Sequence, residues 1–292
     1  MKLAQQQVEA FHEEGYLVVE RGLEDQDLGP LIEDLDALVD EVAQELHTEG
    51  KIANLYQDEP FKRRIACLSR ETGSSLQGRV SLPTNLRPPL FDFLHNQNLL
   101  DMLEDLVGPE IYCNPTHHVR PKLPEETVPT DWVQASPFHQ DAAVLLPEAD
   151  DTLVITTWIP LVDSTPENGT LQIYPGLHKG EIRRHEQFPT GWGLVDECLP
   201  EGEPLTLSMK KGDLIFIHCR TPHGSQPNRT DAVRWSLDLR FHDARKPAGR
   251  PQPGLLVRSR ENALPDRAAW VESWDKARAD KRPKKMYRWP TA

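Results

Sequence analysis

The sequence is poor in cysteine, has no long apolar run and carries no excess of positive charge. Its four cysteines are scattered without the spacing of a disulfide framework or a zinc site, so they predict reduced thiols. No apolar stretch approaches the roughly 18 residues that predict a membrane-spanning helix. Residues 1–7 also lack the apolar segment of a signal peptide. We therefore expect a cytoplasmic protein with no membrane partner.

The charge balance narrows the class of partner further. Lys and Arg number 33 against 46 Asp and Glu, which gives a formal net charge of −13. Such a chain is repelled by nucleic acid and by anionic membrane surfaces, so neither is an expected partner. Its 292 residues can bury the core of one large domain, and no internal repeat indicates a second. We expect a small-molecule partner, while no pattern indicates an oligomeric state.

Hydrophobic periodicity places most helices before most strands. Apolar residues at helical spacing predict helices over residues 5–14, 23–47 and 90–107. A short strand is expected at residues 16–20, and strands dominate from residue 111 to about residue 241. This order is typical of an α+β chain that is mainly β with flanking helices. It suits a double-stranded β-helix core, the jelly-roll or cupin-like barrel.

We expect these elements to form a single domain over residues 1–292. Its helical N-terminal part would cover residues 1–110, and the jelly-roll core about 111–242. A C-terminal extension follows over residues 243–292, with a helix predicted around 266–279. Its tryptophans are expected to dock back on the barrel: Trp270, Trp274 and Trp289.

The triplet His139-Gln140-Asp141 is the most informative motif in the chain. On a strand, residues i and i+2 point to the same side, so His139 and Asp141 are expected to project together. A second imidazole, His223, follows a predicted strand that ends at Pro222. Two histidines and one carboxylate on one face of a metal form the facial triad of non-haem Fe(II) oxygenases, which leaves positions open for co-substrate and O₂.

A third segment supplies a possible anion clamp. Residues 231–241 alternate between an apolar face and a polar face that includes Arg234 and Ser236. Such a polar face suits the wall of a cavity that holds an acid. The planar guanidinium of Arg234 matches a carboxylate bidentately, and Ser236 can add a hydroxyl donor.

With these motifs in order, the chain resembles the phytanoyl-CoA dioxygenase family of Fe(II)/2-oxoglutarate-dependent oxygenases. The N-terminal segment Phe11-His12-Glu13-Glu14-Gly15-Tyr16 is similar to the opening of that family. The resemblance covers most of residues 8–242. Each motif is weak alone, whereas the ordered set is highly specific. The other matching stretches are Phe138 to Asp141, Trp158 to Leu171, Tyr174 to Gly180, Gly212-Asp213, His223 to Asn228, and Arg234.

The resemblance implies a set of roles for the site residues. His139, Asp141 and His223 would bind Fe(II), and Arg234 would hold the distal carboxylate of 2-oxoglutarate. The resemblance also places Ser225 and Trp158 beside that co-substrate. With O₂, the expected reaction hydroxylates an aliphatic C–H bond of a small molecule and releases succinate and CO₂.

Two details of the motifs refine this expectation. Halogenating relatives replace the metal-binding carboxylate by a small residue, so Asp141 favours hydroxylation over halogenation. Before His178 the chain has Leu177, where the family usually has a serine. We interpret that segment, and His218 as well, as structural.

Two other classes of function remain open at this point. One is a non-catalytic cupin-like protein that binds a small molecule, and the other is a Zn- or Mn-dependent isomerase or hydrolase on the same barrel. Neither needs a carboxylate clamp beside the metal, so Arg234 and Ser225 favour the oxygenase.

Several further polar residues have two interpretations. Gln134 could reach a ligand or lie on the surface, and Arg240 could contact substrate or form a structural ion pair. Residues 181–203, with Trp192 between two glycines, could form a lid over the pocket. One set alternates onto a single strand face, which could meet an anionic substrate or be a solvated edge: His118, Arg120 and Lys122.

Overall fold

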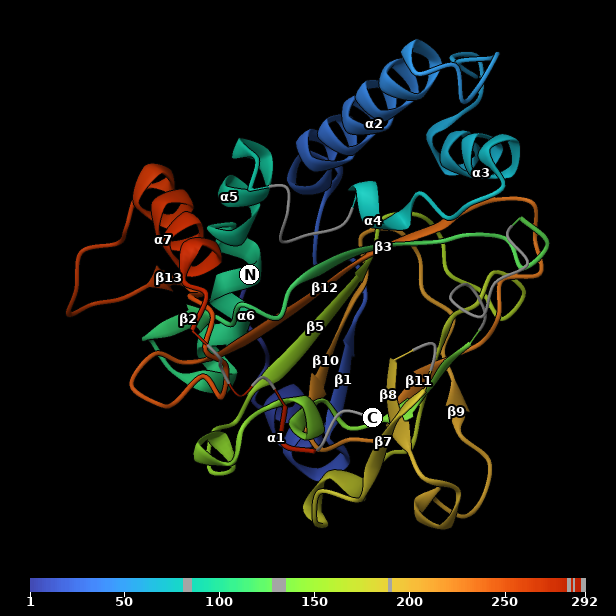
Figure 1. Ribbon diagram of the computed structural model, residues 1–292. Helices are drawn as coiled ribbons and strands as arrows, with labels where there is room; N and C mark the ends of the chain where they lie inside the picture. The colour runs from blue at the N-terminus through green and yellow to red at the C-terminus, as the bar shows by residue number, and fades with distance from the viewer. Residues whose placement is uncertain (81–85, 128–134, 189–190, 283–284, 286, 290–292) are drawn as a thin grey trace.

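The computed structural model describes residues 1–80, 86–127, 135–188, 191–282, 285 and 287–289. Two antiparallel sheets face each other, and helices cover the outer side of the larger one (Figure 1). Among the described residues, no helix combines the length and apolar character needed to cross a bilayer.

The larger sheet has seven strands in the order β1-β10-β5-β12-β2-β13, with β3 also paired to β12. Every pairing in it is antiparallel, and β12 forms the longest strand at its centre. The strands are β1 (Tyr16–Val19), β2 (Ile111–Cys113), β3 (His118–Lys122), β5 (Ile155–Pro160), β10 (Leu214–His218), β12 (Arg234–Asp243) and β13 (Leu255–Arg258).

The smaller sheet has four strands in the order β4-β11-β6-β9, and a hairpin of two further strands lies against β4. These strands are β4 (Ser136–His139), β6 (Leu171–Ile173), β9 (Leu205–Thr206) and β11 (His223–Ser225), and the hairpin consists of β7 (His185–Phe188) and β8 (Gly191–Leu194). Apolar side chains of the two sheets pack together between them: Trp158, Ile215 and Ile217 from the larger sheet, and Leu171 and Ile173 from the smaller.

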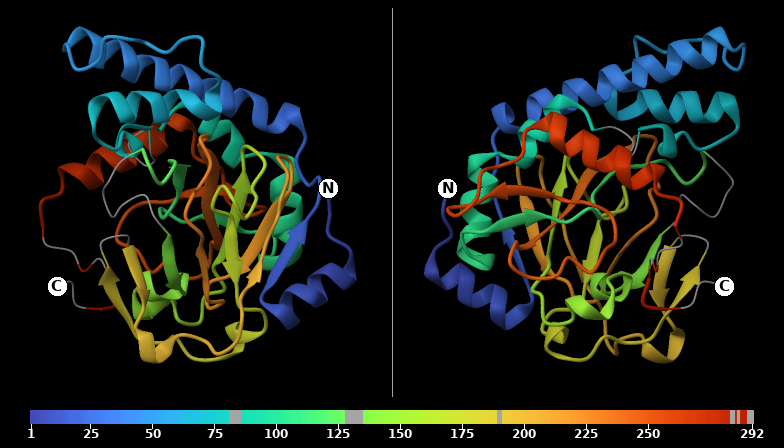
Figure 2. Two further views of the ribbon diagram at one scale, coloured as in Figure 1. Left: turned by 90° about the vertical axis from the view of Figure 1, so that its right-hand side faces the viewer. Right: turned by 60° about the vertical axis from the view of Figure 1, so that its left-hand side comes forward.

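The main apolar core lies between the helices and the larger sheet (Figure 2). The alternation of β12 sends Trp235, Leu237 and Leu239 into this core, because successive side chains of a strand point to opposite faces. Trp235 stacks on Phe61 with their ring centroids 4.6 Å apart. The helices are α1 (Gln5–Glu14), α2 (Asp25–Thr48), α3 (Phe61–Thr72), α4 (Gln77–Val80), α5 (Pro88–Leu94), α6 (Gln97–Val107) and α7 (Arg267–Ala279).

The prediction of one continuous helix over residues 90–107 is wrong, because the helix is interrupted at Asn96. The side chain of Asn96 accepts a hydrogen bond from the backbone N–H of Leu99 at 3.0 Å and caps α6. A side-chain acceptor at this position satisfies an N–H that a helix start leaves without an intrahelical partner. The predictions for α1, β1, α2 and α7 are confirmed to within a few residues.

The larger sheet takes strands from all three predicted parts of the chain. β1 comes from the helical N-terminal part and pairs with β10, and β13 comes from the C-terminal extension and pairs with β2. Trp270 and Trp274 on α7 are buried in the main core, as predicted, so the extension packs against the rest of the fold.

Candidate metal and co-substrate site

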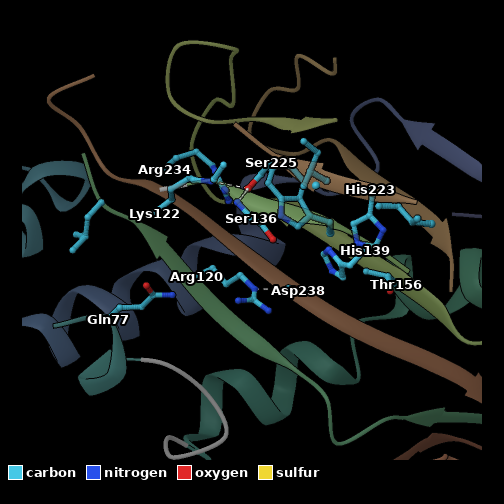
Figure 3. Close-up of a pocket in the computed structure, with 16 residues that line it drawn as sticks. Gln77, Arg120, Lys122, Ser136, His139, Thr156, His223, Ser225, Arg234 and Asp238 are labelled. Atoms are coloured by element: carbon cyan, nitrogen blue, oxygen red, sulfur yellow. Dashed lines mark hydrogen bonds and ion pairs between the residues drawn. The ribbon is translucent and has the colours of Figure 1, made fainter. Parts of the chain in front are cut away.

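The two histidines of the predicted triad meet on the smaller sheet. His139 ends β4 and His223 begins β11, and these two residues are direct partners in the antiparallel register. Their ring centroids lie 4.4 Å apart (Figure 3). The Nδ1–H of His139 donates to the carbonyl of Pro137 at 2.9 Å, and that of His223 to the carbonyl of Thr221 at 3.0 Å. Both rings therefore present Nε2, the atom that can bind a metal.

Asp141 reaches the same point from a different kind of element. The expectation that it shares a strand with His139 is wrong, because β4 ends at His139 and Asp141 begins a 3₁₀ turn, Asp141–Val144. Its carboxylate nevertheless faces both imidazoles, with Oδ1 3.7 Å from His139 Nε2 and Oδ2 3.8 Å from His223 Nε2. The turn thus brings the carboxylate to the position for which the prediction used a strand.

Two residues of the larger sheet hold the Asp141 carboxylate. Arg240 donates to Oδ1 at 2.6 Å, and the hydroxyl of Thr156 donates to Oδ2. Arg240 on β12 and Thr156 on β5 are cross-strand partners, so one rung of the larger sheet fixes the acid. Of the two interpretations for Arg240, the structure therefore shows the ion pair.

The electrostatics keep His139 and Asp141 in metal-binding form. Burial, with the nearby His223, lowers the pKa of His139 to about 3, so its ring is neutral at physiological pH. Burial alone would raise the pKa of Asp141, but Arg240 and the imidazoles hold it well below its usual range. The carboxylate is therefore ionised.

These donors fit a metal ion. One ligand atom from each of His139, Asp141 and His223 lies within 4.8 Å of the other two, and Asp141 is only 1% exposed. Two imidazoles and one carboxylate are a donor set suited to non-haem Fe(II).

Three cationic side chains line a cavity next to this cluster: Lys122, Arg234 and Arg120, of which Arg120 pairs with Asp238 (Figure 3). Arg234 is buried, and its Nη1 donates to Ser236 Oγ at 2.6 Å, while its guanidinium carbon lies 5.1 Å from the centre of the Trp158 ring. Lys122 is the register partner of Arg234 on β3, and its Nζ donates to Ser225 Oγ at 2.6 Å. The predicted co-substrate residues therefore lie together in the cavity that His139 and His223 also line.

No carboxylate among the described residues pairs with Arg234 or Lys122. Burial and the nearby Arg120 lower the pKa of Arg234 to about 9. Burial, together with Arg234 and Arg120, lowers the pKa of Lys122 well below its usual value. Two cations held together away from bulk water form a preorganised site for an anion.

Lys122 is the residue of this cavity whose position sequence reasoning did not assign. The alternation of β3 was recognised, but only as a possible substrate entrance or a solvated edge. Its register with β12 instead places Lys122 opposite Arg234 and Arg120 opposite Ser236, so both line the cavity. Strand pairing, which periodicity alone does not give, was the missing information.

The remaining polar candidates separate clearly. His178 is buried, and its Nε2 lies 3.1 Å from the carbonyl oxygen of His12, in agreement with a structural role. His218 is held near it, with the two ring centroids 5.0 Å apart. Gln134 lies outside the described residues.

The predicted lid segment contains the β7–β8 hairpin, which is tied to the metal cluster through Gln140. The fully buried Gln140 side chain donates to the carbonyl of Arg220 at 2.7 Å and accepts from the backbone N–H of Arg183 at 2.7 Å. The backbone N–H of Gln140 donates to His185 Nε2 at 2.9 Å. Trp192 on β8 lines a second cavity, and this cavity also reaches His139 and Asp141.

The family model for phytanoyl-CoA dioxygenase (PhyH) matches residues 11–236, which is most of the chain. The chain belongs to the phytanoyl-CoA dioxygenase family. The resemblance stated above is therefore confirmed.

Individual relatives of this PhyH-family chain are distant. The peroxisomal phytanoyl-CoA dioxygenase of Rattus norvegicus is 28% identical over 159 residues, which cover 52% of this chain and 45% of the rat enzyme. The chain thus spans about half the length of the first curated relatives it matches. A probable alpha-ketoglutarate-dependent hypophosphite dioxygenase of Stutzerimonas stutzeri is 26% identical over 242 residues, or 79% of this chain and 75% of that protein.

A solved structure confirms the predicted fold class of this PhyH-family chain. The epimerase SnoN, crystallised with Fe3+, alpha ketoglutarate and nogalamycin RO, superposes with a TM-score of 0.57 at 20% identity. The superposition covers 84% of this chain and 86% of that one. At this identity the likeness shows the fold alone, a jelly-roll core with flanking helices.

Proposed function

We propose that this protein is an Fe(II)- and 2-oxoglutarate-dependent oxygenase that hydroxylates an aliphatic C–H bond of a small molecule. In this reaction one atom of O₂ enters the product as a hydroxyl group, and 2-oxoglutarate is converted to succinate and CO₂. One observation carries the proposal. The His139, Asp141 and His223 donors adjoin a cavity in which the buried Arg234 contacts no carboxylate of the described residues.

In the proposed site, His139, Asp141 and His223 hold the iron. Arg234 binds the distal carboxylate of 2-oxoglutarate, with Lys122 and Ser225 as further donors and Trp158 as a wall. When bound, iron and 2-oxoglutarate supply the oxidation that breaks the substrate C–H bond.

The protein itself contributes geometry and a water-poor environment. Carbonyl oxygens behind His139 and His223 fix the ring tautomers, so Nε2 is free of a proton for the metal. Arg240 and Thr156 hold the carboxylate of Asp141 and limit its rotation. Such outer contacts orient metal ligands and tune the metal they bind.

The pair formed by the buried Arg234 and the half-buried Lys122 also separates this proposal from its alternatives. A metal-dependent isomerase or hydrolase gains nothing from Arg234 and Lys122 beside the metal, because its reaction needs no dicarboxylate. A binding protein without metal gains nothing from the convergence of three metal-type donors. A dicarboxylate that binds the metal at one end uses both features.

Anaerobic addition of Fe(II) and 2-oxoglutarate tests the proposal directly. We expect a weak visible charge-transfer band, followed by slow formation of succinate after air is admitted. His223→Ala should abolish both signals, because it removes a proposed iron ligand. Catalysis supported by Zn(II) or Mn(II) without 2-oxoglutarate would identify a different class of enzyme.

Replacement of the clamp tests the role of Arg234. We expect Arg234→Lys to raise the 2-oxoglutarate concentration for half-maximal succinate formation by about 10-fold or more, since the planar fork is lost. Iron binding, measured by titration without 2-oxoglutarate, should change little. Arg229→Lys is a matched control, because the Arg229 side chain is 73% exposed. An unchanged requirement in Arg234→Lys would refute the clamp.

A further inference from the structure

The second cavity adjoins the metal cluster but is not lined by Arg234. It shares Arg120, Ser136 and His139 with the first cavity, and it also reaches Asp141. A molecule in this second cavity would therefore sit beside the proposed iron without displacing the group held by Arg234. This position is where a substrate must lie if the proposed function holds.

Five of the fifteen residues that line this cavity follow the family match. That match ends at residue 236. The tail returns to the β7–β8 hairpin at Tyr287 (Figure 2). Lining residues beyond the match are Arg240, Arg250, Gln252, Trp274 and Tyr287.

The wall presents aromatic surfaces from two separate parts of the chain. Trp192 on the hairpin and Tyr287 in the tail have ring centroids 5.4 Å apart. The guanidinium carbon of Arg250 lies 5.1 Å from the centre of the Tyr287 ring. Trp274 is 4% exposed and lines the cavity from α7, and its indole N–H has no hydrogen-bond partner among the described residues. Buried donors are normally hydrogen-bonded, so a ligand atom or a water molecule in the cavity would complete this one.

The charge of the lining is opposite to that of the whole protein. The chain carries a net charge of −13, yet three arginines line this cavity against one carboxylate, Asp141. Arg120 and Arg240 are held by ion pairs with Asp238. Arg250 is positioned by a hydrogen bond to the carbonyl of Val144 at 2.9 Å and by the Tyr287 ring. A local excess of fixed guanidinium groups favours an anion.

We propose that the second cavity binds the substrate, and that this substrate is a small organic anion with a flat apolar body. The acid group would lie against Arg250, and the flat body against the Trp192, Tyr287 and Trp274 surfaces. This arrangement presents an edge of the substrate to His139 and Asp141. The inference rests on the proposed function for its catalytic meaning, but the binding chemistry can be tested separately.

Residues beyond 236, together with Trp192 of the hairpin, then determine specificity in this chain. The metal donors and the lining of the 2-oxoglutarate cavity come from residues 77–238, and all of these residues except Asp238 lie inside the family match. Aromatic and cationic groups of the tail are added to this shared centre. Ring-on-ring contact rewards a planar body, and a guanidinium rewards an acid group in a fixed direction.

Binding of three probe molecules to the full-length protein, with Fe(II) and 2-oxoglutarate under anaerobic conditions, tests this assignment. The probes are 2-naphthoate, its neutral amide 2-naphthamide, and cyclohexanecarboxylate, and binding is followed by tryptophan fluorescence. We expect 2-naphthoate to bind about 10-fold more tightly than the amide. It should also bind about 3-fold or more tightly than the non-aromatic acid.

Three variants at two positions assign these preferences to residues. Arg250→Gln should remove the preference for naphthoate over naphthamide, and Arg250→Lys should restore part of it. Trp192→Ala should remove the preference for the aromatic acid. Arg282→Gln is the control, because Arg282 lies in the same tail with its side chain 85% exposed and pairs with Asp280. Circular dichroism and thermal melting confirm that each variant is folded.

Clear results would overturn the inference. Equal affinity for naphthoate and naphthamide, no saturable binding of either, or an unchanged preference in Arg250→Gln would each do so. The charge-transfer band and succinate formation of the wild-type protein report the proposed function independently. Probe binding without those signals would keep the cavity assignment and reject the oxygenase, and those signals without probe selectivity would do the reverse.

Discussion

At the scale of single residues, the most consequential feature is a pair of cations that the fold holds side by side. Lys122 and Arg234 are register partners on β3 and β12, and both face the co-substrate cavity. The two positive charges repel each other, and burial adds to the free-energy cost of keeping both side chains ionised. A dicarboxylate that binds between them removes both penalties, so protonation of Lys122 is coupled to binding.

This coupling predicts a pH dependence for 2-oxoglutarate. The pKa of Lys122 in the free protein lies below its usual value, and a bound carboxylate raises it again. Affinity should therefore weaken as pH rises through the lowered pKa, with proton uptake on binding above it. Isothermal titration in buffers of different ionisation enthalpy measures that uptake. Lys122→Met should weaken binding by about 10-fold and remove the uptake.

The same residue marks a change in folding stability with pH. A lysine whose pKa is lower in the folded than in the unfolded state binds fewer protons when folded. Stability is therefore expected to rise with pH between the lowered pKa and about 10.4. If the affinity for 2-oxoglutarate still changes with pH in Lys122→Met, the titrating group lies elsewhere.

At the scale of secondary structure, the sequence predicted elements whose pattern is regular and long. α2 and β12 show clear helical or alternating periodicity, and both formed as expected. The interruption between α5 and α6 was missed, because a single asparagine inside an apolar stretch scarcely alters the periodicity. The pattern around Asp141 was also misleading, because the apolar residues that follow it suit a strand as well as a turn. Local hydrogen bonds decided both cases.

The cap at Asn96 should be measurable in the stability of the whole fold. Its Oδ1 accepts from Leu99 N–H, and its Nδ2 donates to Asp27 Oδ1 at 2.7 Å, which ties the start of α6 to α2. We expect Asn96→Ala to lower the free energy of unfolding by about 1–2 kcal/mol, measured by urea denaturation. Asn96→Ser keeps a capping oxygen and should recover much of that loss. Equal destabilisation by both would show that the cap contributes little.

At the scale of the whole molecule, the metal site joins the two sheets. The smaller sheet supplies His139 and His223, the 3₁₀ turn supplies Asp141, and the larger sheet holds that acid through Arg240 and Thr156. Sequence motifs identified the donor residues, because their types and order are informative. They could not identify Arg240 and Thr156 as partners of the acid, because those contacts depend on how one sheet faces the other.

A metal bound at this junction should stabilise both sheets together. Mn(II) resists oxidation and suits the same donors, so it can replace iron in a thermal unfolding assay. At 100 times its dissociation constant it should add about 2.7 kcal/mol, and hence raise the melting temperature by roughly 5 °C. His223→Ala should lose the shift, whereas His47→Ala, on an exposed position of α2, should keep it. Retention of the full shift in His223→Ala would mean that the metal binds somewhere other than between the sheets.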